Sequence, residues 1–595
     1  MFLRFTTRKK NGKEHRYWSL VENRRVASGR VVQRHALYLG EINDTQQAAW
    51  RKTIEIFEEG KTRPRTVALF PEDRIGPLKD EQVVRIRLKE LSLHRPRQWG
   101  GCWLAVELWE QLGLDRFWAQ RLPPSRKGTR WDWVLQILVT YRLLDPGSEW
   151  RLYRHWFEHS AMADLLGAEQ ELAEIHKLYD CHERLLAHKK ELFSHLTQRW
   201  KDLFNAQFEV LLYDLTSTYF ESDPPFPDGD KRRYGYSRDK RPDCVQVVVA
   251  LIVTPEGFPL AYEVLAGNTS DKTTLEGFLK KIEEQYGQAE RIWVMDRGIP
   301  TEKTLEQMRQ AKPPANYLVG TPRGRLTQYE QRLAELPWQV AREGVSVKLL
   351  VEQNELYVLA QSRDRVNKER AMRRGQLKRI WQRLKQLQTM KLKRDELLKK
   401  LGAALHEYPA AARFIHSSVE KQRARLSFSL RKDKLRQARR REGRYLLRSN
   451  MTTGRSPAEL WQFYIQLTEV EAAFKNLKDD LALRPIYHQL EHRIEAHIFI
   501  SFLAYCLHVT LRRRLRDLAP GLTPRSVLEK FTTIQMLDVH LPTDDQRTVI
   551  LSRYTHPETD VQVLLYRLKL QLPPQPPPKI TKPKPSGGPE SVVKT

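Results

Sequence analysis

Cysteine is scarce in this sequence. The 595 residues contain four, Cys102, Cys181, Cys244 and Cys506. So few scattered thiols cannot form a disulfide framework, and no two have the Cys-x-x-Cys spacing of a thiolate zinc site. The N-terminal region also lacks an apolar run of signal-peptide length. We therefore expect a protein of the reducing cytoplasm.

Long uncharged apolar runs are absent as well. The most apolar stretch, 494–511, contains Glu495, His497 and His508. It therefore favours a buried core helix over a membrane span, which needs about 20 largely uncharged residues. Hydrophobic residues make up 40% of the chain and charged residues 29%. This composition excludes a disordered chain, a collagen and a membrane bundle, and the length implies several domains.

Positive charge is in excess and unevenly placed. The chain has 102 Lys+Arg against 73 Asp+Glu, a formal net charge of +29, which suggests nucleic acid or, second, an anionic membrane surface as partner. Residues 361–450 contain 28 basic and 8 acidic side chains and so hold most of the excess. Such a segment can neutralise many DNA phosphates without reading base sequence. The alternative is a basic helical hairpin packed on an acidic face of the same protein.

The spacing of apolar residues divides the chain into regions of different character. Residues 206–321 predict a mixed α/β sheet of five strands, namely 208–214, 244–254, 258–267, 291–296 and 316–321. The first three should form an antiparallel meander, and a helical crossover should join the last two. The other expected regions are a small β-rich region at 1–90, an all-α domain at 91–205, a basic insertion of strands and long helices at 322–455, the second part of the core at 456–515, a helical region at 516–572 and a disordered Pro/Lys-rich tail at 573–595.

Three carboxylates stand at notable places in this arrangement. Asp214 ends the first predicted strand, Asp296 ends the fourth, and Glu471 lies on a helix that begins at Ser456-Pro457. Taken singly, an aspartate at a strand end is more often a turn or cap residue. Together, three converging carboxylates would repel one another unless divalent cations neutralised them. Two such ions can activate a nucleophile and stabilise the leaving oxygen of a phosphodiester.

The helical periodicity selects Glu471 from its neighbours. At about 100° per residue, Glu471 shares the apolar face with Tyr464 and Lys478, whereas Glu469 lies on the opposite face and should be solvated. Glu471 is therefore expected beside the sheet. The alternative is an ordinary boundary glutamate paired with Lys475 at i+4.

Tyr464, Glu471 and Lys478 also match the Tyr-x2-Arg-x3-Glu-x6-Lys (YREK) signature of bacterial insertion-sequence transposases, although Leu467 stands at the arginine position. Further segments resemble one long-chain branch of these enzymes: YGYSRDKRPDCVQV (234–247), LAGNTSDKTTL (265–275), MDRG (295–298) and EAAFKNLKDDLALRPIYH (471–488). The resemblance covers 208–320 and 445–510. It implies a ribonuclease-H-like catalytic core that carries an Asp-Asp-Glu triad and is interrupted by an insertion.

The resemblance further implies the chemistry of the site. Asp214, Asp296 and Glu471 would bind two Mg²⁺ ions, with Mn²⁺ able to substitute, and the enzyme would cut the transposon ends and join the freed 3′-OH to target DNA. Tyr464 and Lys478 would hold DNA phosphates. The change to Leu467 removes a cation expected on a terminal phosphate.

Further DNA-binding candidates are Lys475, Arg484 and Trp338, with Trp338 or Trp381 as a base-stacking residue. The expected partner is double-stranded DNA, both the terminal inverted repeats and the target, bound by a homodimer in the bacterial cytoplasm at the nucleoid, with no membrane. The helical domain at 91–205 would either recognise the repeats or serve as a dimerisation scaffold.

Three alternatives stay open at this point. One is a structure-selective, Mg²⁺-dependent nuclease that cleaves DNA without joining it, and another is an inactive DNA-binding relative of a transposase. The third is remote: HQLEH (488–492) matches the His-x-x-Glu-His pattern of inverted zinc peptidases, with His488 and His492 as ligands.

Overall fold

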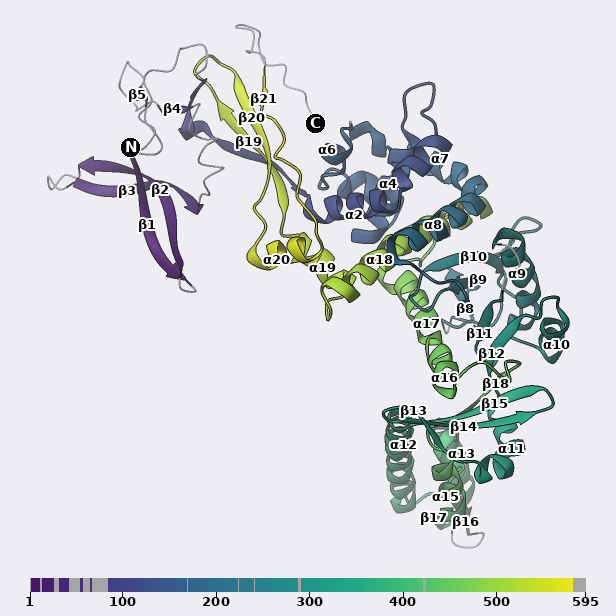
Figure 1. Ribbon diagram of the computed structural model, residues 1–595. Helices are drawn as coiled ribbons and strands as arrows, with labels where there is room; N and C mark the ends of the chain where they lie inside the picture. Colours follow the sequence, from purple (N-terminus) through teal and green to yellow (C-terminus); the bar gives the residue numbers. More distant parts are fainter. Residues whose placement is uncertain are drawn as a thin grey trace. The chain divides into compact units, whose positions relative to one another are not determined.

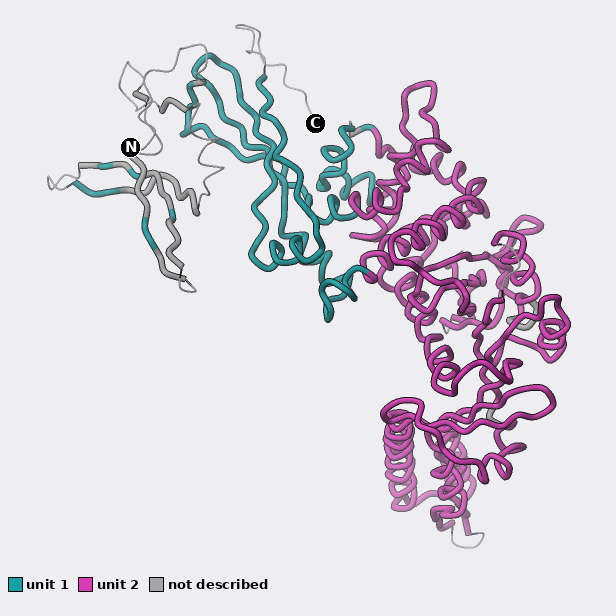
Figure 2. The backbone as a smooth tube through the Cα atoms, viewed as in Figure 1, with its two compact units in different colours: residues 1–105, 152–171, 514–595 teal, residues 106–151, 172–513 magenta. Residues whose placement is uncertain are grey.

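The computed structural model describes residues 84–581 apart from 169, 223, 240, 287–289 and 421–423, together with strand-bearing stretches at 2–10, 13–25, 31–41, 54–56 and 65–66. The chain forms two compact units (Figure 2). The first contains residues 1–105, 152–171 and 514–595, and the second contains 106–151 and 172–513.

The second unit is built on a mixed sheet whose strand order begins β10-β9-β8-β11-β12 (Figure 1). These strands are β8 (Val210–Phe220), β9 (Val245–Val253), β10 (Pro259–Ala266), β11 (Ile292–Met295) and β12 (Asn316–Gly320). As predicted, the first three form an antiparallel meander, and β11 runs parallel to both β8 and β12. Helices α9 (Asp271–Tyr286) and α10 (Glu302–Gln310) make the connections. This mixed sheet with helices fits a ribonuclease-H-like core.

The expectation of only five strands is wrong, because the insertion continues the same sheet. Beyond β12 the order is β18-β15-β14-β13, which makes nine strands. The added strands are β13 (Gln339–Arg342), β14 (Val345–Glu352), β15 (Glu355–Ser362) and β18 (Arg444–Ser449). Without β18 the strand β12 would be a bare edge with unpaired backbone groups. An ion-pair network holds the junction, in which the buried Arg448 binds the buried Glu355 and, at 2.8 Å, the exposed Glu302.

The helical part of the insertion has its own apolar core. Ile380, Leu384 and Leu387 of α12 pack against Leu401 of α13 and Leu426 of β17. Its elements are α11 (Arg323–Glu335), α12 (Arg363–Thr389), α13 (Arg394–Glu407), α14 (Pro409–Ala412), β16 (Ile415–Val419), β17 (Leu426–Leu430) and α15 (Lys432–Arg440). Most lysines and arginines of α12 and α15 face solvent. In the described part of the chain, most of these basic side chains are therefore not packed on an acidic face.

The segment that carries Glu471 is not one straight helix. It begins as predicted, with a capping box between Ser456 and Glu459, and forms α16 (Pro457–Ile465). A turn at Gln466 separates α16 from α17 (Leu467–Lys475), and a π turn follows at Asn476–Asp480. A π turn holds more residues per turn than an α-helix. The rotation of about 100° per residue that placed Lys478 on the same helix face as Glu471 therefore does not hold as far as Lys478.

The rest of the second unit is helical. Its helices are α3 (Leu114–Arg121), α4 (Trp131–Leu144), α7 (Ile175–Leu185), α8 (Lys189–Phe204) and α18 (Glu491–Leu518). The indole of Trp200 donates to Thr510 at 3.2 Å. In the part of the chain that the structure describes, α18 is the one helix long and apolar enough to cross a membrane, yet 89% of its apolar window is buried inside the protein. The predicted core helix at 494–511 is thereby confirmed.

The first unit corrects three predictions. A strand, β7 (Ser92–Gln98), opens the region expected to be all-helical at 91–205, and it pairs with β19 (Gln535–Pro542). The region 516–572 contains the hairpin of β19 and β20 (Thr548–Tyr554) between α19 (Pro524–Phe531) and α20 (Thr559–Arg567). The tail expected to be disordered contains β21 (Lys579–Ile580), paired with β20, while 582–595 lie outside the described residues.

A buried arginine explains why β7 and β19 come together. The guanidinium of Arg97 binds Asp538 on β19 at 2.9 Å and Asp164 at 2.8 Å. Charge pairs between residues hundreds of positions apart leave no local pattern in the sequence, so this strand pairing could not be predicted from it. The same unit contains the antiparallel sheet β1 (Phe2–Lys10), β2 (Lys13–Arg25) and β3 (Val31–Glu41), and the short strands β4 (Ile54–Ile56), β5 (Arg65–Thr66) and β6 (Val84–Ile86).

Candidate active site

Asp214 and Asp296 occupy matching positions on two neighbouring parallel strands. Tyr213 of β8 is in register with Met295 of β11, and an aspartate follows each of them: Asp214 lies within β8, and Asp296 comes directly after the last residue of β11. Asp214 does not end its strand as predicted, since β8 continues to Phe220 against β9. It lies where the pairing with β11 ends and the pairing with β9 continues. The two carboxylates therefore lie at the end of the parallel pairing between β8 and β11.

Glu471 on α17 completes the group. A cavity of about 380 Å³ is lined by Asp214, Asp296 and Glu471 together with Tyr464. Glu469 is not part of it. Contrary to the expectation of a solvated side chain, Glu469 forms an ion pair with Arg512 of α18 at 2.9 Å. The structure therefore brings together the three predicted carboxylates and separates the neighbouring glutamate from them.

The pKa of Asp214 is raised in this cavity. Burial raises the pKa of its carboxyl to about 7, repulsion from Asp296 and Glu471 adds to the rise, and the Leu215 amide, which donates to it at 2.8 Å, partly opposes it. A carboxyl group in this state holds its proton near neutrality unless a cation compensates the charge. Mg²⁺ and Mn²⁺ prefer oxygen ligands, and three carboxylates around one open space provide them. The residues present thus fit a divalent cation.

Gly320 makes room for Tyr464 in this cavity. Val319 of β12 is in register with Met295, so Gly320 lies opposite Asp296 across the sheet. A Cβ atom on Gly320 would approach the Tyr464 hydroxyl to 2.7 Å and Asp296 Oδ1 to 3.4 Å. Tyr464 itself stacks on Tyr445 at 5.7 Å, and its pKa is raised by burial and by Asp296. Gly320 was missed from sequence because it looks like an ordinary glycine at the end of an apolar strand.

Cations line the same cavity, although Leu467 supplies none. The lining includes Arg297, directly after Asp296, and Arg365 and Arg444 from the insertion. The Arg365 guanidinium lies 4.9 Å from the centre of the Tyr445 ring, which in turn stacks on Tyr464. These three arginines were not singled out from sequence. The insertion pair belongs to the dense basic run 361–450, in which no spacing rule distinguishes one arginine from another.

Comparison with known protein families bears on what this cavity does. A family model described as the transposase DDE domain matches residues 205–507, which carry all three carboxylates. The chain belongs to the DDE transposase family. A second model, described as the IS1634 family transposase N-terminal domain, matches residues 3–58. The protein is thus an insertion-sequence DNA transposase, an enzyme that binds DNA, cleaves it and transfers strands with the help of a divalent metal.

Comparison with individual proteins adds little to the family assignment. Among solved structures, the piggyBac transposase synaptic complex with hairpin DNA, determined by cryo-EM, matches with a TM-score of 0.33 and 10% identity. That match covers 74% of this chain and 82% of the other. No match was found among the curated proteins.

The other predicted DNA-binding residues of the transposase lie outside the cavity lining. Lys478 and Arg484 both bind the carboxylate of Asp239, at 2.8 and 2.6 Å. Lys475 is exposed on α17, and no ion pair joins it to Glu471 in the described part of the chain.

Trp338 is 38% exposed and lies beside two cations, Lys348 at 4.9 Å and Arg444 at 5.6 Å from its ring. Because Arg444 also lines the cavity, Trp338 lies next to a residue of the cavity lining. Trp381 packs edge-on against Phe428 at the insertion's apolar core. Of the two tryptophans considered for base stacking, Trp338 is the more exposed one.

The HQLEH motif does not form the ligand pair of an inverted zinc peptidase. His488 is buried 3.3 Å from Glu149, whereas His492 is exposed and lies 3.7 Å from Glu183. The two imidazoles have different partners. The peptidase alternative is therefore contradicted both by this geometry and by the family.

Proposed function

We propose that Asp214, Asp296 and Glu471 are the catalytic carboxylates of this transposase and that they hold two Mg²⁺ ions, which Mn²⁺ can replace. The observation that carries the proposal is the cavity where β8, β11 and α17 bring the three side chains together, with the pKa of Asp214 raised to about 7. Bound divalent ions would supply the charge needed to activate an attacking hydroxyl and to stabilise a leaving oxygen.

The remaining lining residues position DNA. Arg297, Arg365 and Arg444 present guanidinium groups suited to bidentate contact with a phosphate, and the Tyr464 hydroxyl can donate to another phosphate oxygen. Arg365 thus provides at the cavity the positive charge that Leu467 lacks. The exposed lysines and arginines of α12 and α15 hold the flanking duplex without reading its sequence.

The substrates follow from this arrangement. The enzyme cuts double-stranded DNA at the terminal inverted repeats of its own element and joins the freed 3′-OH to target DNA. Its core is ribonuclease-H-like, with an insertion between the second and third carboxylates. It acts as a homodimer that holds two ends together, in the bacterial cytoplasm at the nucleoid. Lys475, Lys478, Arg484 and Trp338 contribute to DNA binding outside the cavity.

The test measures cleavage and joining separately on duplexes that carry the element's ends, with Mg²⁺ as the added metal. Asp214→Asn, Asp296→Asn and Glu471→Gln should each lower both rates by about 100-fold or more, because loss of groups that merely orient a metal ligand already costs about 10–100-fold. Glu469→Gln is the matched control, two residues from Glu471 and outside the cavity, and should keep both activities.

Two results would overturn the proposal. Cleavage without joining, at any Mg²⁺ concentration and in the presence of target DNA, would identify a structure-selective nuclease. DNA binding by the folded wild-type protein with no cleavage would identify an inactive relative.

A further inference from the structure

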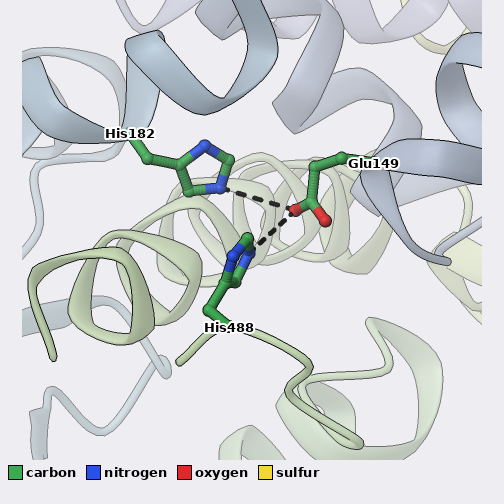
Figure 3. A group of neighbouring side chains, drawn as sticks. All are labelled: Glu149, His182 and His488. Atoms are coloured by element: carbon green, nitrogen blue, oxygen red, sulfur yellow. Dashed lines mark hydrogen bonds and ion pairs between the residues drawn. The ribbon is translucent and has the colours of Figure 1, made fainter. Parts of the chain in front are cut away.

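A second group of metal-binding side chains lies in the interior of the same unit, built from residues that the active site does not use. Glu149 of the short helix α5 (Glu149–Arg151), His182 of α7 and His488, just ahead of α18, point toward one another (Figure 3). The Oε1 atom of Glu149 lies 3.4 Å from His182 Nε2 and 3.3 Å from His488 Nε2. The three donor atoms all lie within 4.8 Å of one another, and all three residues are buried.

His182 presents a lone pair to this group. Its Nδ1 atom lies 2.8 Å from the carbonyl oxygen of Leu178, which can only accept a hydrogen bond, so Nδ1 carries the ring proton. In the neutral ring, Nε2 is then an acceptor aimed at the Glu149 oxygen. The side chain is fully buried, and Nε2 makes no hydrogen bond. Two facing acceptors repel, so a positive charge has to lie between them, either a proton or a metal ion.

The spacing of the ligand atoms fits a metal. Four ligands around Zn²⁺ at bond lengths of about 2.0–2.1 Å stand roughly 3.3–3.4 Å apart in a tetrahedron. The distances from Glu149 to His182 and His488 have these values. Two imidazoles and one carboxylate are a donor set that zinc takes.

The surroundings leave this group incompletely neutralised. Arg142 comes no closer than 4.0 Å to Glu149 and donates instead to the carbonyl of Ala482 at 3.1 Å. His497 Nδ1 stands 3.7 Å from Glu149 Oε1 and is the nearest further imidazole. Within the described residues, Oε1 of Glu149 has one hydrogen-bond partner, His488 Nε2 at 3.3 Å. A cation bound between Glu149, His182 and His488 would therefore meet a carboxylate with one such partner and a ring nitrogen with none.

We propose that Glu149, His182 and His488 bind one zinc ion, separate from the catalytic carboxylates, that fastens α5 and α7 to the segment leading into α18. The ion would tie the helical part of the unit, contributed by 106–151 and 172–205, to the C-terminal half that carries Glu471. Its role is structural, and it does not depend on the catalytic roles proposed for Asp214, Asp296 and Glu471.

The test is the zinc content of the full-length protein, purified without a metal-affinity step, incubated with excess ZnCl₂ and dialysed against metal-free buffer. The wild type should retain about one zinc per chain, as expected for a buried site with three protein ligands. Glu149→Ala, His182→Ala and His488→Ala should each lose it. His492→Ala, in the same HQLEH motif but exposed, and Asp214→Asn, in the active site, should retain it.

His182→Cys covers the case in which the alanine variants do not fold. A thiolate is also a zinc ligand, so this variant should keep the metal. With Co²⁺ in place of zinc it should gain a near-ultraviolet thiolate-to-cobalt band that the wild type lacks. Folded wild-type protein without retained zinc would show a proton-bridged buried cluster only, and folded His182→Ala with full zinc would show that the metal binds elsewhere. Loss of zinc in His492→Ala would assign the metal to the HQLEH pair instead.

Discussion

The ammonium group of Lys478 lies 2.8 Å from Oδ1 of Asp239, and both side chains are nearly buried. Arg484 binds the same oxygen at 2.6 Å. Burial lowers the pKa of Lys478, and the bond to Asp239 opposes that change. Lys478 is thus engaged within the protein and has to exchange this carboxylate for a phosphate in order to contact DNA. Lys475, exposed on α17, needs no such exchange.

Replacing these two lysines should therefore have different effects. Lys475→Met should lower the slope of log K against log salt for DNA binding by about 0.9, the value for one phosphate contact, and leave the melting temperature unchanged. Lys478→Met should destabilise the fold by about 1.5–3 kcal/mol, because a buried charged hydrogen bond is lost while Arg484 still compensates Asp239. Salt-dependent binding and urea unfolding measure the two effects. Unchanged stability of Lys478→Met would mean that Lys478 is free to contact DNA.

The raised pKa of Asp214 predicts how stability depends on pH when no metal is present. Between its ordinary value of 3.8 and about 7, the folded protein keeps a proton that the unfolded chain has lost. The folded state then binds more protons, so its stability falls as pH rises through this window, by at most about 1.4 kcal/mol per pH unit. Asp214→Asn cannot titrate and should gain stability over the wild type from pH 4 to pH 7, with no further gain above.

Urea unfolding in EDTA at stepped pH values measures this difference. Asp228→Asn, at an exposed aspartate, serves as the control and should show no such trend. Added Mg²⁺ should reduce the pH dependence of the wild type, because a cation compensates the ionised carboxylate. Parallel curves for the wild type and Asp214→Asn would contradict the electrostatic account of the cavity.

Gly320→Ala should disturb the active site through one contact. The new Cβ would lie 2.7 Å from the Tyr464 hydroxyl, so the Tyr464 ring has to move away from residue 320 within the cavity. A displacement of this size can cost up to about 100-fold in cleavage rate. Gly277→Ala on α9, where a Cβ meets open space, is the matched control and should retain the rate.

A double variant isolates the cause of that loss. Tyr464→Phe removes the atom with which the Cβ collides, so Gly320→Ala should destabilise the Tyr464→Phe protein less than it destabilises the wild type. The difference is an interaction energy between two residues in contact, read from urea unfolding of the four proteins. Additive destabilisation would show that Gly320→Ala acts through another contact, such as that with Asp296.

The sequence predicted the catalytic sheet well because its strands are buried on both faces. The run VQVVVALIV of β9 is apolar at every position but one and cannot be mistaken for an amphipathic helix. The first strand was predicted to stop at Asp214, yet Thr216 and Ser217 beyond it are buried and paired with β9. Polar side chains, such as the β-branched Thr216, continue a strand when a neighbouring strand pairs with it and covers them.

What the sequence could not show is pairing over long distance. The strands of the insertion were recognised locally, but their union with β12 depends on which strand is the open edge of the core sheet. The cluster of Glu149, His182 and His488 joins residues more than 300 positions apart. Motif spacing relates only residues that are near in sequence, so it could not predict this contact. The departure of α16 and α17 from one straight helix depends on a turn at Gln466, a residue that is ordinary in a helix interior.

The concentration of charge in the insertion makes a quantitative prediction about DNA binding. Lys434, Arg436, Arg439 and Arg440 of α15 are exposed, and their replacement by glutamine removes four positive charges from one helix. If each contacts a phosphate, the slope of log K against log salt should fall by about 3.6. The control replaces Lys201, Lys280, Lys303 and Lys312, four exposed lysines outside the insertion, and should change the slope by less than about 1. An equal loss in both variants would mean that DNA responds to total charge and that the insertion has no special part in holding it.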